Sequence, residues 1–108
     1  MTNLNKPYTA LILAGGQGQR MGGQDKGWVR WQGLPLIEHV LNRVRQQTIA
    51  PAEILISASR HIDQYALTGA RVVSDLRPDF AGPLAGIESG LLYAKHDLVL
   101  VVACDMPL

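Results

Sequence analysis

Four short apolar runs constrain the fold more than any other feature of this chain. They span Tyr8–Leu13, Glu53–Ala58, Arg71–Val73 and Leu98–Ala103. Runs of this length that are rich in valine, isoleucine and leucine are typical of strands. Their apolar residues follow one another instead of alternating with polar ones, which indicates burial on both faces of a sheet. Strands of this kind belong to parallel sheets that are covered by helices.

Helical segments are predicted between these runs. After Pro35 the apolar residues recur at helical spacing, at Leu36, Ile37, Val40, Leu41 and Val44. Residues 62–67 predict a short helix that Thr68-Gly69 ends. A third helix is predicted from Pro83 to about Ala94, with an apolar stripe of Leu84, Ile87, Leu91 and Leu92. We place Pro35 and Pro83 at the first helical position, where the missing N–H of proline is not needed.

This alternation of strands and helices predicts an α/β fold. We expect a Rossmann-like, doubly wound parallel sheet with strand order 3-2-1-4 and helices on both faces. A chain of 108 residues is long enough for one domain, which we assign to residues 1–108. The topological switch point, where the strand order reverses, then lies between the first and fourth strands. Ligands bind beyond the carboxyl ends of the strands there.

A glycine-rich segment follows the first strand. Between Leu13 and Lys26 there are five glycines, together with Arg20 and Lys26. Glycine lets the backbone approach a ligand closely, and successive free N–H groups can hold an anion. Two cationic side chains add multiple donors, so the segment predicts a polyphosphate site. The alternative is an ordinary glycine-rich surface loop. The P-loop order and the dinucleotide fingerprint are both absent, the latter because Met21 stands where glycine or alanine is required.

The next residues, Gly27 to Leu34, form a second small unit. Trp28 to Trp31 read as a short extended piece, with Gln32-Gly33 as a turn. We expect the two tryptophans to pack in the core or at its rim rather than to stack on a ligand, because large aromatic side chains dominate core burial.

Polar residues follow three of the predicted strands. Ser57, Asp75 and Asp105 come at or just after the ends of the second, third and fourth runs. The carboxyl ends of parallel strands meet at one edge of a sheet, so these residues should gather beside the glycine-rich segment. A carboxylate just past a buried strand is well placed to hold Mg²⁺, but a lone aspartate there is also a common cap or turn residue.

Charge and cysteine content exclude some classes of protein. The net charge is +1, so no general affinity for nucleic acid or for a membrane surface follows. Residues 1–45 nevertheless carry six basic and two acidic side chains, which suits an anionic ligand near the glycines. Cys104 is the single cysteine, and the first six residues contain no apolar signal segment. We therefore expect a cytoplasmic protein without a membrane span.

Three motifs carry a resemblance to a known family. They are L-A-G-G-x-x-x-R-M-G-x-x-x-K at residues 13–26, G-P-L-A-G at residues 82–86 and C-D-x-P at residues 104–107. With these motifs the sequence resembles the MobA-like nucleotidyltransferases. Within that family it is most similar to the molybdenum cofactor guanylyltransferases. The resemblance implies transfer of GMP from GTP to molybdopterin, with release of pyrophosphate. Related cytidylyltransferases, sugar-phosphate nucleotidyltransferases and non-catalytic nucleotide-binding modules are the alternatives.

The resemblance also implies roles for individual residues. Arg20, Lys26 and the backbone N–H groups of Gly15 and Gly16 would stabilise the charge of the leaving pyrophosphate, and Leu13, Ala14 and Gly15 would read the base. Asp75 and Ser57 match nucleotide-contacting positions, but Ser57 stands where the family usually has asparagine, and a strand-end serine without that role is an open alternative. Asp105 matches the aspartate that binds Mg²⁺. The implied partners are GTP, molybdopterin and, as candidates, other proteins of cofactor biosynthesis or molybdoenzymes.

Family members extend beyond the third motif, whereas this sequence stops at Leu108. We therefore expect the chain to be the N-terminal part of a longer nucleotidyltransferase domain. The fourth strand would then expose an apolar edge. We expect the 108 residues alone to bind nucleotide weakly, to lack transfer activity and to associate.

Overall fold

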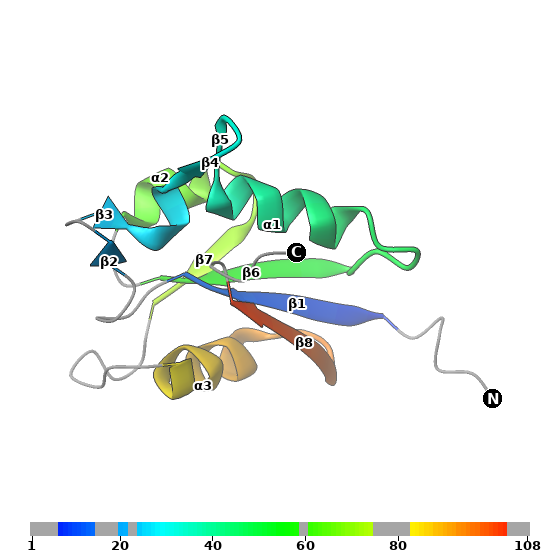
Figure 1. Cartoon of the computed structure of the whole chain (residues 1–108). Coiled ribbons are helices and arrows are strands. Elements are labelled where there is room, and N and C mark those ends of the chain that lie inside the picture. Colours follow the sequence, from blue (N-terminus) through cyan, green and yellow to red (C-terminus); the bar gives the residue numbers. More distant parts are fainter. Residues whose placement is uncertain (1–6, 15–19, 22–23, 59–60, 75–82, 104–108) are drawn as a thin grey trace.

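A four-stranded parallel sheet forms the centre of the computed structural model, which describes residues 7–14, 20–21, 24–58, 61–74 and 83–103. The strands are β1 (Tyr8–Leu13), β6 (Glu53–Ser57), β7 (Arg71–Val73) and β8 (Leu98–Ala103). Their order in the sheet is β7-β6-β1-β8, and all neighbouring pairs are parallel. This is the predicted order 3-2-1-4. Figure 1 shows helices α1 and α2 on one face of the sheet and α3 on the other.

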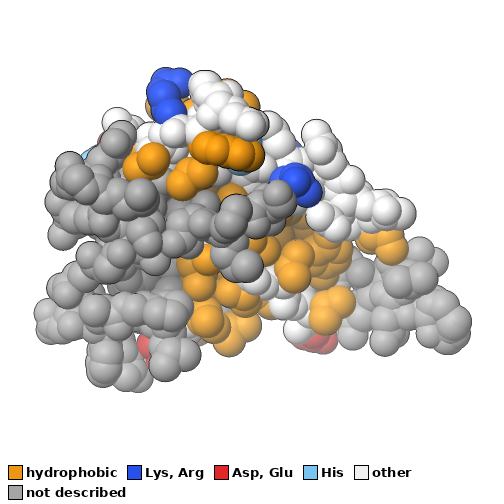
Figure 2. Space-filling model, in the orientation of Figure 1, with side chains coloured by type: hydrophobic (Ala, Val, Ile, Leu, Met, Phe, Trp, Pro, Cys, Tyr) orange, Lys and Arg blue, Asp and Glu red, His pale blue; other side chains and the backbone are white. Residues whose placement is uncertain are grey.

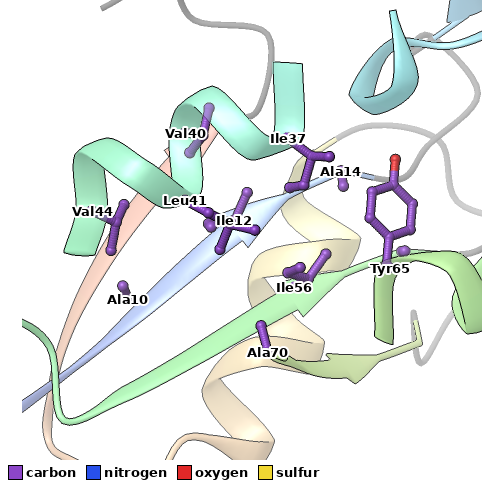
Figure 3. Packing of buried hydrophobic residues seen from close by; sticks show 11 residues of the cluster. Ala10, Ile12, Ala14, Ile37, Val40, Leu41, Val44, Ile56, Tyr65 and Ala70 are labelled. Atoms are coloured by element: carbon purple, nitrogen blue, oxygen red, sulfur yellow. The ribbon is translucent and has the colours of Figure 1, made fainter. Parts of the chain in front are cut away.

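Helix α1 (Leu36–Arg45) covers the first face with the predicted stripe. Its buried side chains are Ile37, Val40, Leu41 and Val44. They pack on Ala10 and Ile12 of β1 and on Ile56 of β6 (Figure 3). Full burial of each large side chain contributes about 1.5–3 kcal/mol, so this contact is a main source of stability. The helix begins one residue later than predicted. Pro35 precedes it with an extended ψ of 148°, and Leu36 donates its N–H to the Val29 carbonyl oxygen at 2.8 Å.

Helix α3 (Pro83–Tyr93) covers the second face, and the predicted stripe is correct at Ile87 but wrong at Leu91 and Leu92. Leu91 and Leu92 are 55% and 63% exposed. Ile87 packs on the buried Leu11 cluster together with Ala94, which follows the helix, and Gly90 between them is buried. A Cβ at Gly90 would overlap the Leu11 side chain, with Cδ1 2.6 Å away. The prediction ranked residues by apolarity, whereas the helix turns its small residue toward the sheet and so approaches it closely.

Helix α2 (Ile62–Ala66) is the predicted short helix, and Gly69 follows it with a φ of +93°. Four two-residue strands and a 3₁₀ turn precede α1. They are β2 (Arg20–Met21), β3 (Gln24–Asp25), η3 (Lys26–Trp28), β4 (Arg30–Trp31) and β5 (Leu34–Pro35).

Strands β4 and β5 pair as a hairpin around the predicted Gln32-Gly33 turn, whose φ angles of +52° and +85° are those of a type I′ turn. The predicted extended piece is wrong at Trp28, which belongs to the 3₁₀ turn. Trp28 packs against the core as expected, whereas Trp31 is 54% exposed at the rim, edge-on to His39.

Strand β8 is an edge strand in the described sheet. Leu98, Leu100 and Val101 are 47%, 43% and 39% exposed. Figure 2 shows hydrophobic side chains gathered on the face of the molecule where β8 lies in Figure 1. Within the described ranges, the helices are too short or too polar to cross a membrane.

Candidate functional site

The carboxyl ends of all four strands lie in one row. Leu13 pairs with Ser57 on one side and with Ala103 on the other, and Ser57 pairs with Val73. Two further bonds extend the row by one residue. The Ala14 N–H donates to the Ser57 carbonyl oxygen at 2.9 Å, and the Ala58 N–H donates to that of Val73 at 3.0 Å. One edge of the sheet therefore receives the ends of four strands from across the sequence.

The switch point falls within this row. The connection from β1 to β6 carries α1 on one face of the sheet, and the connection from β7 to β8 carries α3 on the other. Strands β1 and β8 are adjacent, with Leu13 opposite Ala103. Gly15 and Gly16, Asp75 and Asp105 lie outside the described residues. The strands that lead into them end side by side at this edge, which is the geometry that the sequence predicted.

Leu13 and Ala14 occupy the end of the central strand. Leu13 is 8% exposed and Ala14 is fully buried. Because the Ala14 N–H is engaged by Ser57, a contact of Ala14 with a base would use its carbonyl oxygen. Ser57 is 2% exposed, and its side chain shares the α3 face with Leu55 and Leu13. The structure brings these three predicted residues together at the row.

One predicted cationic residue lies in a small hairpin, and the other follows that hairpin directly. Arg20 of β2 pairs with Asp25 of β3, and Lys26 follows directly in η3. The backbone positions of Arg20 and Lys26 are therefore close, although five residues lie between them in the sequence. Figure 1 shows β2 and β3 at the end of the molecule toward which β1 runs. The side chains of Arg20 and Lys26 lie outside the described part of the structure.

Sequence reasoning missed one neighbour of this hairpin. Tyr65 of α2 is fully buried, and its ring contacts the turn that begins at Lys26. The signal in the sequence was a glycine at position 27, directly after the lysine. A glycine that adjoins a functional residue often marks a close approach by another part of the chain.

A charged group also orders the opposite, amino end of the sheet. The Glu53 Oε1 atom accepts hydrogen bonds from the Thr9 hydroxyl at 2.7 Å and from the Lys95 N–H at 2.9 Å. Partial burial raises the pKa of Glu53, but these bonds and the charges of Lys95 and His96 outweigh it, so the pKa lies below its ordinary value of 4.5. This carboxylate ties β1, β6 and the turn before β8 together, far from the candidate site.

A doubly wound parallel sheet with a glycine-rich, cationic segment after its first strand is the architecture of nucleotide-binding α/β proteins. The family model of the MobA-like NTP transferase domain matches residues 10–108, and the chain belongs to this family.

Relatives and solved structures agree with this membership. The chain is 52% identical over 101 residues to a molybdenum cofactor guanylyltransferase of Pseudomonas aeruginosa and 52% identical over 101 residues to one of Pseudomonas fluorescens. Each alignment covers 94% of this chain. The chain spans about half the length of these relatives, 50% and 49%.

Among solved structures, molybdopterin-guanine dinucleotide biosynthesis protein A from Archaeoglobus fulgidus superposes with a TM-score of 0.56 at 26% identity, covering 79% of this chain and 42% of that one. A CMP:2-keto-3-deoxy-manno-octonic acid synthetase in complex with CTP superposes with a TM-score of 0.75 over 94% of this chain and 42% of that one. Its identity is 20%, so this likeness concerns the fold alone.

Proposed function

We propose that this protein is a molybdenum cofactor guanylyltransferase that transfers GMP from GTP to molybdopterin and releases pyrophosphate. The observation that carries the proposal is 52% identity over 94% of the chain to relatives of that name. The row of strand ends beside the Arg20–Lys26 hairpin supports it, because a triphosphate needs cations and backbone donors at the same edge.

The phosphate contacts are assigned to the glycine-rich segment. In the reaction an oxygen of the acceptor phosphate attacks the α-phosphorus of GTP, the bond to the bridging oxygen breaks, and negative charge moves onto pyrophosphate. The N–H groups of Gly15 and Gly16 and the side chains of Arg20 and Lys26 stabilise that charge. The β2–β3 hairpin supports joint action, because its pairing holds the backbones of the two cationic residues near each other.

The nucleoside contacts are assigned to the ends of the inner strands. Leu13, Ala14 and Gly15 contact the base through backbone groups, with the carbonyl oxygen of Ala14 as the acceptor, since its N–H is bonded to Ser57. Ser57 and Asp75 contact the nucleoside from the ends of β6 and β7. The register that joins Leu13, Ser57 and Val73 supports this assignment.

Asp105 is the proposed ligand of Mg²⁺. A carboxylate oxygen is the ligand type that this cation prefers, and β8 ends two residues earlier, beside β1. Mg²⁺ neutralises phosphate charge when bound. Within the described residues, histidine, cysteine, aspartate and glutamate do not gather in a group of three.

We assign residues 1–108 to one nucleotide-binding unit that forms the N-terminal part of a longer nucleotidyltransferase domain in a cytoplasmic protein. The length of the relatives, about twice this chain, supports the first part of the assignment. The polypeptide of 108 residues alone is then inactive. Acceptor contacts, and contacts with other proteins of cofactor biosynthesis or with molybdoenzymes, would come from the remainder.

The test compares GTP, CTP, ATP and UTP as donors to molybdopterin, with the longest natural form of the chain and with Mg²⁺ present or removed by a chelator. We expect Mg²⁺-dependent pyrophosphate release with GTP. A preference for CTP would contradict the guanylyl assignment in favour of a cytidylyltransferase. Calorimetric binding of GTP without turnover would indicate a nucleotide-binding module without chemistry.

A further inference from the structure

The turn that begins at Lys26 rests on a buried aromatic side chain. Tyr65 is fully buried in the core cluster that also contains Ala14 and Ile37. In Figure 3 its ring stands at one end of that cluster, beside these two residues. A core position for tyrosine is common, so the contacts at the far side of the ring decide whether it has a further role.

Those contacts are made with the residues next to Lys26. A Cβ on Gly27 would overlap the Tyr65 hydroxyl oxygen and lie 3.0 Å from ring carbons Cε1 and Cζ. The Trp28 ring lies 5.1 Å from the Tyr65 ring, centroid to centroid, at an interplanar angle of 39°. The first residue after Lys26 and the second one both touch the same ring, so the backbone of the turn has little freedom to shift.

Tyr65 is itself held from both sides. Its N–H donates to the His61 carbonyl oxygen at 3.0 Å, and its carbonyl oxygen accepts a bond of 2.6 Å from the Thr68 hydroxyl. Helix α2 is short, and these bonds at its start and just past its end hold the backbone that carries the ring. The same ring packs in one cluster with Ala14, the last described residue before the glycines.

We propose that Tyr65 is a positioning residue for Lys26. It acts as a buttress for the 3₁₀ turn, and glycine is required at position 27 because no Cβ fits against the ring. The inference rests on the proposed function, since it assigns Tyr65 to the same phosphate site. Tyr65 acts through Gly27 and Trp28 on the backbone of Lys26, the residue to which the proposed function assigns the cation.

The kinetic test compares Tyr65→Leu with Tyr65→Phe in the longest natural form of the chain. Tyr65→Leu removes the ring, and we expect it to raise KM for GTP or lower kcat on the order of tenfold, as for a small misplacement of a reacting group. Tyr65→Phe keeps the ring and should retain most of the activity. Val44→Ala is the matched control, because Val44 is buried in the same cluster but lies far from Tyr65, near the C-terminal end of α1. It should lower Tm and leave both constants unchanged.

A second measurement does not depend on activity. Trypsin cleaves after lysine, so the rate of cleavage at Lys26-Gly27, divided by the rate at the exposed Lys95-His96 bond, reports how firmly the turn is held. We expect this ratio to rise several-fold in Tyr65→Leu and to stay near the wild-type value in Tyr65→Phe and Val44→Ala. An unchanged ratio with unchanged kinetics in folded Tyr65→Leu would overturn the proposal. If the wild type transfers no nucleotide at all, the proposed function fails, and the cleavage ratio still decides whether Tyr65 holds the turn.

Gly27→Ala supplies an independent check. We expect it to raise both the cleavage ratio and KM, and we expect Tyr65→Phe in the same molecule to lessen both effects, because the overlap with the hydroxyl oxygen is gone. Strictly additive effects of the two substitutions would contradict the contact on which the inference is built.

Discussion

The N–H of Ala14 donates a 2.9 Å hydrogen bond to the carbonyl oxygen of Ser57. This bond extends the pairing of β1 with β6 by one residue, to the point where the glycine-rich segment begins. It also restricts the chemistry at the switch point, because the Ala14 amide is engaged by protein. In the proposed site, a contact between Ala14 and a base would therefore use the Ala14 carbonyl oxygen.

The Ser57 side chain gives the first prediction. Its backbone holds Ala14, so Ser57→Ala should leave the strand pairing intact and remove only the hydroxyl. If that hydroxyl contacts the nucleotide, KM for GTP should rise about fivefold, the equivalent of roughly 1 kcal/mol for one hydrogen bond. Steady-state kinetics with varied GTP checks this. An unchanged KM would indicate a strand-end serine without a nucleotide contact, which is the alternative that the sequence left open.

The two cationic residues of the glycine-rich segment, Arg20 and Lys26, give the second prediction. Lys26→Ala and Arg20→Ala should each lower kcat/KM by the equivalent of about 2–4 kcal/mol, roughly 30- to 900-fold, if the lost charge serves the transition state. Arg30→Ala is the control, because its guanidinium is exposed and donates to the Gly33 carbonyl oxygen at 2.9 Å. Tm should change little in the three variants. Unaltered turnover in both Lys26→Ala and Arg20→Ala would instead favour a surface loop without a role in binding.

The sequence predicted the sheet well because its strands are continuous apolar runs. Leu11 and Ile12 point to opposite faces and are both fully buried. A run without polar residues indicates burial of this kind, on both faces of a sheet. The order of the strands then followed from the alternation with helices and from the rules of doubly wound sheets. The placement of Leu13, Ser57 and the segment before Asp105 at one edge followed in turn from that order.

Other features were not predictable from apolarity alone. The face that α3 turns toward the sheet depends on Gly90, because the missing side chain lets the helix approach Leu11 closely. Tyr65 was missed for a related reason, since its partner Gly27 is distant in sequence and has no apolar side chain that would mark the contact in a hydrophobic pattern. A pattern of hydrophobic side chains marks what is buried, but it does not mark where a backbone must come close.

Gly90 provides the third prediction. Gly90→Ala should lower the free energy of unfolding by about 1–3 kcal/mol, because the added methyl group would overlap Leu11 and push α3 from the sheet. Leu92 on the same helix is 63% exposed, so Leu92→Ala should change the free energy of unfolding by no more than about 0.5 kcal/mol. Urea unfolding followed by circular dichroism measures both. Equal effects of the two substitutions would argue against the close approach of α3.

Glu53 provides the fourth prediction, on pH dependence. Its folded-state pKa lies below 4.5, so its contribution to stability is present above pH 4.5 and is lost as the pH falls through the folded-state pKa. Glu53→Gln should therefore have a lower free energy of unfolding than wild type at pH 7. The difference should be on the order of 1 kcal/mol, because the carboxylate is partly exposed, and it should shrink below pH 4.5. Thermal unfolding at several pH values tests this. Asp97→Asn, an exposed neighbour of the same turn, serves as the control for net charge.

The fifth prediction concerns the edge strand. Strand β8 pairs with β1 on one side, and Leu98, Leu100 and Val101 remain well exposed on it. Within the described sheet, this six-residue apolar edge offers unpaired backbone groups and hydrophobic surface to another chain. We therefore expect the 108-residue polypeptide to self-associate in sedimentation velocity runs, and Leu100→Lys to reduce the associated fraction because a charge at the edge opposes pairing. Leu67→Lys is the matched control, since Leu67 is 87% exposed but lies in the turn after α2. If both lysine variants reduce association equally, general charge rather than the β8 edge governs it.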